Sequence, residues 1–187
     1  MIARSRWVKY LEVRMTISLY DVGLKTYLQV LPAVSNFLEK GRVFFEEKGT
    51  DLNEVVKISL YEDMAPLAFQ IFSVTHHSLG AINGLESGQF GPPRMPPELD
   101  YQALQGLVRE AEEKIKGMDE ATINGYEGGD VVFKMGSNSL PFVAEDFIMT
   151  FSLPNFYFHA TTAYDILRKE GVPVGKMDFL GSMRMKG

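Results

Sequence analysis

The stretch Phe151–Gly181, FSLPNFYFHATTAYDILRKEGVPVGKMDFLG, decides the fold. Its apolar residues recur at helical spacing, and we expect one long helix over residues 144–170. Residues 171–173, Gly-Val-Pro, stop that helix because glycine and proline are poor continuations of it. Pro154 removes a hydrogen bond to the carbonyl of Thr150, so the pattern predicts a bend there.

Three further helices are predicted upstream of this stretch. The first helix is expected to begin near Thr16 or Ser18, since both hydroxyls can cap it, and Ser18 stands three residues before Asp21, as in a capping box. Gly41 is expected to close that helix, and Asp100 to cap the third. The first helix is predicted to run from residue 16 or 18 to residue 41, with a kink at Pro32. The second is predicted over residues 64–85, with Asp63 as N-cap, and the third over residues 101–118.

The connections complete the predicted fold. Residues 41–62 form a long link, partly helical over 52–56, which we read as a crossover between the first two helices. Residues 130–135 and 139–142 alternate like strands around a Gly-Ser-Asn turn, which predicts a small β-hairpin. The tail is expected to pack back through Val174, Met177, Phe179 and Leu180. The sequence therefore predicts an all-α four-helix bundle with a long crossover between helices one and two and a hairpin between helices three and four.

Composition excludes several classes of protein. The 187 residues are 45% hydrophobic and 23% charged, which is typical of one soluble globular domain. A net charge of -5 argues against nucleic-acid binding. The absence of cysteine excludes disulfides and cysteine-based zinc sites, and no apolar run reaches the length of a membrane helix. We expect a cytoplasmic protein with no membrane or nucleic-acid partner.

Residues 1–14 differ from the rest of the chain. They carry four basic residues and one acidic residue, a net charge of +3, without the apolar core of a secretory signal. We interpret them as an extension ahead of a natural start at Met15, with the bundle domain over residues 15–187. A short organelle-targeting segment is the alternative.

The histidines are the candidates for chemistry. His77 lies on a small, polar stripe of the second helix, and His159 shares a face of the fourth helix with Asn155. If both faces point inward, the two histidines can hold a divalent metal, although a catalytic zinc site needs three protein ligands. Asn155, Glu145 or another acid would have to supply the third. The other interpretation is that each histidine satisfies a hydrogen bond in the core, and His76 is assigned to such packing.

Other signals are weaker. The dinucleotide-binding, phosphate-binding, H-E-x-x-H and G-x-S-x-G motifs are absent. The aromatic run at residues 156–158 spans most of a helical turn and cannot all point inward. At least one of its rings must face the hairpin, the tail or a second subunit, and we predict a homodimer.

Several motifs together resemble a known family. The segments LPNFYFH, TTAY, GVPVG and DFLG within Leu153–Gly181 are similar to an uncharacterised bacterial and fungal domain family, and the SLYD at Ser18–Asp21 resembles its opening. That family is placed in the DinB/YfiT-like superfamily, which is described as one of metalloenzymes. The resemblance covers Thr16 to about Gly181 and implies a four-helix bundle.

The resemblance also implies a metal site of three histidines, one on the second helix and an H-x-x-x-H pair on the fourth. His77 matches the first position and His159 matches one of the pair. Four residues to either side of His159 stand Asn155 and Ala163, so the third ligand departs from the pattern. Alanine cannot bind a metal, and an amide oxygen is a poor ligand for zinc or nickel.

Two hypotheses for function follow. The first is a binding or structural homodimer with a degenerate metal site, with room for a small-molecule ligand in the bundle cavity. The second is a metal-dependent enzyme, of the thiol-dependent transferase or hydrolase type that the resemblance implies. It would use His77 and His159, with water or an acid completing the metal shell. The missing third histidine favours the first. Which residues would be catalytic, and which substrate is used, stay open.

Overall fold

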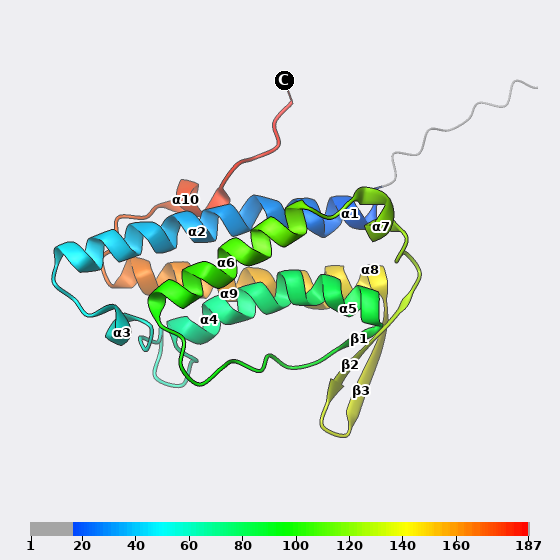
Figure 1. Ribbon diagram of the computed structural model, residues 1–187, viewed down its shortest axis with the longest axis horizontal. Helices are drawn as coiled ribbons and strands as arrows, with labels where there is room; N and C mark the ends of the chain where they lie inside the picture. Colours follow the sequence, from blue (N-terminus) through cyan, green and yellow to red (C-terminus); the bar gives the residue numbers. More distant parts are fainter. Residues whose placement is uncertain (1–16, 187) are drawn as a thin grey trace, which may run out of the picture.

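The computed structural model describes residues 17–186. The extension predicted at residues 1–14 and the start at Met15 lie outside these residues. The described chain is mostly helical with a small three-stranded sheet at one end (Figure 1). The helical elements are α1 (Leu19–Val22), α2 (Leu24–Glu47), α3 (Leu52–Val55), α4 (Leu67–Thr75), η1 (His76–Gly80), α5 (Ala81–Ser87), α6 (Tyr101–Lys116), α7 (Glu120–Asn124), α8 (Ala144–Asp146), η2 (Phe147–Ser152), α9 (Leu153–Lys169) and α10 (Lys176–Leu180). The strands are β1 (Gln89–Phe90), β2 (Asp130–Met135) and β3 (Asn138–Val143).

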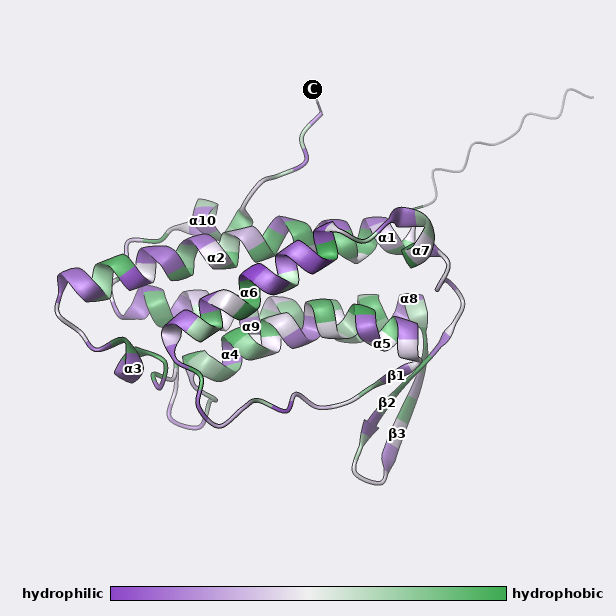
Figure 2. Ribbon diagram, viewed as in Figure 1, coloured by the Kyte–Doolittle hydropathy of each residue, from purple (hydrophilic) through white to green (hydrophobic). Residues whose placement is uncertain are grey.

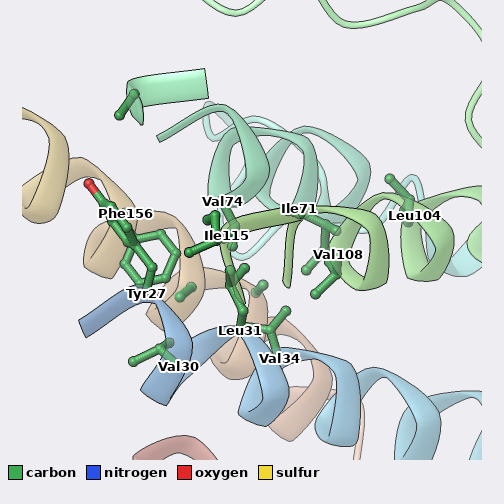
Figure 3. Packing of buried hydrophobic residues seen from close by; sticks show 14 of the residues in the cluster. Tyr27, Val30, Leu31, Val34, Ile71, Val74, Leu104, Val108, Ile115 and Phe156 are labelled. Carbon is green, nitrogen blue, oxygen red and sulfur yellow. The ribbon is translucent and has the colours of Figure 1, made fainter. Parts of the chain in front are cut away.

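The long helices pack around one hydrophobic core. Helix α2 contacts α6 and α9, and α4 contacts the same two helices. Figure 2 shows apolar and polar residues interleaved along these helices, as expected when one side of each is buried. In the core, the rings of Tyr27 and Phe156 meet edge to face with centroids 5.0 Å apart (Figure 3). This contact between the two rings holds α2 against α9. Within the described residues, no helix is both long and apolar enough to cross a bilayer.

Several predicted ends are confirmed. Ser18 and Asp21 form the capping box, and the Asp100 carboxylate accepts a hydrogen bond from the backbone N–H of Ala103. The hairpin pairs β2 with β3 in antiparallel register, Lys134 opposite Ser139. Strand β1 adds a parallel partner to β2, which the sequence did not predict.

The end predicted for the first helix is wrong. Helix α2 continues through Gly41 to Glu47. The helix is interrupted instead at Gly23, which separates α1 from α2. Gly41 is a packing position, because a Cβ there would lie 2.5 Å from the Tyr101 hydroxyl. That hydroxyl is buried and donates to the carbonyl of Leu38 at 2.8 Å.

Two further expectations are corrected. The bend predicted at Pro154 takes the form of a π-helical stretch, η2, which ends just before α9. Phe179 of the tail packs on the Tyr164 ring and Val174 is buried, but Met177 is 65% exposed and does not pack back.

Candidate functional site

The two π-helical stretches, η1 and η2, lie against each other between the packed helices. In η1 and η2, one residue is inserted relative to an α-helix, and such stretches recur at functional sites. The Ser152 hydroxyl donates to the carbonyl of His77 at 2.7 Å. Since serine has a single hydroxyl proton, the Tyr27 hydroxyl must donate to Ser152, at 2.9 Å. Tyr27 is fully buried, and burial raises the pKa of its phenol well above the ordinary value, so it stays a neutral donor.

The structure brings His77 and His159 together. Their ring centroids are 5.8 Å apart and their planes differ by 16°. His77 is 5% exposed, whereas His159 is half-buried, with the Phe69 ring against it edge to face. The two histidines therefore face one another across the contact between η1 and α9.

Gln70 fixes the proton on His159. The Gln70 side chain is buried, and its Nε2 donates to the carbonyl of Ala65 at 2.8 Å. Its Oε1 is then an acceptor, and it lies 2.7 Å from Nδ1 of His159. In neutral His159 the proton accordingly resides on Nδ1, which leaves the Nε2 lone pair free.

Burial keeps both imidazoles uncharged at neutral pH. It lowers the pKa of His77 to about 3, with neighbouring His76 and His159 lowering it further. It lowers the pKa of His159 to about 4, with a smaller contribution from His76. Nδ1 of His77 is buried and has no hydrogen-bond partner among the described residues. The pair thus offers unprotonated ring nitrogens in a largely apolar setting, and such nitrogens are what a metal ion or a hydrogen-bond donor of a ligand requires.

A family model matches most of this chain. Residues 19–180 match the model of a domain of unknown function, DUF1993. The chain belongs to the DUF1993 family. The DUF1993 chain also resembles the crystal structure of a DinB family member from Shewanella denitrificans, with 25% sequence identity and a TM-score of 0.74. The match covers 90% of this chain and 95% of that one, and supports a DinB-like fold. No curated protein matches the chain.

The amide nitrogen of Asn155, the third predicted ligand, bonds to its own helix, and this bond does not involve Oδ1, the atom that would bind a metal. In the DUF1993 chain, Nδ2 of Asn155 donates to the carbonyl of Phe151 one turn earlier, at 2.7 Å. The two carboxylate oxygens of Glu145 share the backbone N–H of Gly128, at 3.0 and 3.1 Å, so Glu145 stabilises a turn. Over residues 17–186, no group of three or more His, Cys, Asp or Glu side chains is arranged to hold a metal ion. The histidine pair supplies at most two ligands, and not the three of a catalytic zinc site.

His76 has a packing role in the DUF1993 chain. Its ring stacks on Phe90 with centroids 4.4 Å apart, and its Nε2–H donates to the carbonyl of Gly91 at 2.8 Å. This agrees with the prediction that His76 packs in the core and satisfies a hydrogen bond there.

Sequence reasoning missed part of the site. Helical periodicity assigns no role in the site to Gln70 or to Tyr27. A hydrogen bond between residues 89 positions apart leaves no local signal. The two π-helical stretches were also missed, because a periodic pattern of apolar residues does not register a single inserted residue.

Proposed function

We propose that this chain is a binding protein on a DinB-like four-helix bundle whose metal site is incomplete. The bundle is supported by the packing of both α2 and α4 on α6 and α9, with residues 48–66 as the crossover. One observation carries the proposal: His77 and His159 meet, and no third ligating side chain joins them in the part of the chain described. A neutral lone pair on His159, held in place by Gln70, suits a hydrogen-bond donor of a small ligand in the bundle.

Metal content tests the proposal. We expect untagged protein, purified without chelating resin, to contain well under one zinc or nickel ion per chain by elemental analysis, because two imidazoles alone bind such ions weakly. His159→Ala is expected to leave this low content unchanged. One ion per chain in the unmodified protein, lost in His159→Ala, would overturn the proposal.

That outcome would instead support a second candidate, a metal-dependent enzyme that uses His77 and His159. The observation in its favour is the buried, unpartnered Nδ1 of His77. Its ligand shell would need water or an acid from outside the described cluster.

We further propose that the protein is a homodimer. Its support is an apolar stripe on η2 and α9, where exposed Met149, half-buried Leu153 and exposed Tyr157 follow one another at four-residue steps beside Phe158. Tyr157 is 41% and Phe158 56% exposed, unusually high for large aromatic side chains in mid-helix. A second copy would cover the same stripe on both subunits.

Light scattering tests the dimer. We expect the unmodified chain to have twice the monomer mass and Phe158→Glu to have the monomer mass, because a charge in an apolar interface is costly. Met177→Glu is the matched control, since Met177 is 65% exposed but lies on α10, away from the stripe. A monomeric mass for the unmodified chain would refute the dimer.

A further inference from the structure

A groove lies on the outer side of η1 and α5, the helical segment that begins with His76 and His77. This groove has a volume of about 650 Å³, within the range of small-molecule sites. The outer side of η1 and α5 forms its floor, and β1, the loop after β1 and the adjacent Lys134 of β2 form its wall. It is lined by His76 but by neither His77 nor His159, so it is distinct from the pair described above.

The sequence builds the apolar wall of this groove. A Cβ on Gly84 would lie 3.2 Å from the Phe90 ring, and one on Gly80 would lie 3.3 Å from Nδ1 of His76. These two glycines therefore let both rings lie close against the helix. His76 in turn stacks on Phe90 and donates to the carbonyl of Gly91, which ties the loop to η1. The floor and wall are thus held by packed rings and a hydrogen bond.

The polar side of the groove is positively charged. Arg94 and Lys134 both line it, and no carboxylate does. Among residues 17–186, neither cation forms an ion pair, although Nζ of Lys134 donates to the side-chain oxygen of Gln89 at 3.2 Å. The chain as a whole has a net charge of -5, so two cations without carboxylate partners on one groove stand out. Guanidinium and ammonium groups recognise carboxylate and phosphate oxygens.

We propose that this groove binds a small organic anion. The apolar body of the ligand lies against Phe72 and Phe90, and its carboxylate or phosphate is held by Arg94 and Lys134. Each charge-assisted hydrogen bond of this kind contributes enough to change affinity by about tenfold. The inference rests on the groove alone and does not depend on metal content or on the histidine pair.

Chemical-shift titrations test the groove. The ¹⁵N-labelled protein is titrated with four probes: phenylacetate, phenyl phosphate, 2-phenylethanol and inorganic phosphate. The first two compare a carboxylate with a phosphate head group. The alcohol keeps the aromatic ring without the charge, and inorganic phosphate keeps the charge without the ring. We expect the backbone amides of Gly80, Gly84, Gly91 and Lys134 to shift with one or both aromatic anions. Whichever of these binds more tightly identifies the head group. The neutral alcohol and inorganic phosphate are expected to bind at least about tenfold more weakly.

Two double variants complete the test. Arg94→Gln/Lys134→Gln should weaken binding of the aromatic anion by about tenfold or more, while Lys116→Gln/Arg168→Gln removes the same charge from exposed positions off the groove and should have little effect. Equal weakening in both would show only a general effect of net charge and would overturn the proposal. Shifts spread over the surface, or inorganic phosphate binding as tightly as phenyl phosphate, would overturn it as well.

Discussion

Gly41→Ala is expected to lower the free energy of unfolding by about 2 kcal/mol, the usual cost of overpacking a core. In an exposed helix, alanine would instead be favoured over glycine. Here the new Cβ would lie 2.5 Å from the Tyr101 hydroxyl, and moving that buried ring would cost its hydrogen bond to the carbonyl of Leu38. Urea denaturation monitored by circular dichroism measures the change.

The chain offers a matched control for this substitution. Gly106 lies inside α6, and a Cβ there would meet no atom within 4 Å. Gly106→Ala should therefore raise stability by about 0.5–1 kcal/mol, the ordinary helix-propensity gain. In a Tyr101→Phe background, which removes the clashing oxygen, Gly41→Ala should cost distinctly less. Equal effects at both glycines, or no relief from Tyr101→Phe, would refute the packing role of Gly41.

Acidification should destabilise the metal-free protein through the histidine pair. Burial lowers the pKa of His77 to about 3 and that of His159 to about 4, below the unfolded value of about 6.5. Well above pH 6.5 both histidines are neutral in either state and contribute nothing. As the pH falls below 6.5, the unfolded chain takes up protons that the folded chain excludes, so stability falls until the folded pKa values are reached.

The size of this effect follows from the same linkage. At pH 5.0 each excluded proton is worth about 2 kcal/mol, and the partial exposure of His159 reduces the pair to about 3 kcal/mol. We therefore expect the loss of stability between pH 7.5 and pH 5.0 to exceed that of His77→Gln/His159→Gln by about this amount in EDTA-treated samples. Burial also lowers the pKa of His76. His76 is present in both proteins, so its contribution to the loss of stability cancels when the two are compared. Identical pH dependence in the two proteins would show that the histidines are not excluded from protonation.

The sequence predicts several local features of this fold, but the N-cap predicted at Asp63 is wrong, because α4 begins at Leu67 with Pro66 as its N-cap. Ser18, Asp21 and Asp100 are read correctly because a helix cap depends on residues three positions apart. The hairpin is also local, since its strands are joined by a tight turn. Gly41 was misread because glycine has the same signature at a helix end as at a close packing contact. The second use depends on Tyr101, which is 60 residues away in the chain.

The candidate site was predictable only in part. Helical faces indicated that His77 and His159 could approach, and the structure places their rings 5.8 Å apart. The bond from His159 to Gln70, the link from Tyr27 through Ser152, and the pairing of β1 with β2 all join distant segments, so periodicity could not predict them.

The most direct test of the incomplete metal site is to supply the missing ligand. Asn155 lies one helical turn before His159 on the same face of α9, so Asn155→His creates the H-x-x-x-H pair without changing the core. Zinc content is measured on untagged Asn155→His and unmodified protein after dialysis against equal zinc. The account predicts about one ion per chain in Asn155→His and well under one in the unmodified protein. One tightly held ion per chain in the unmodified protein would contradict it.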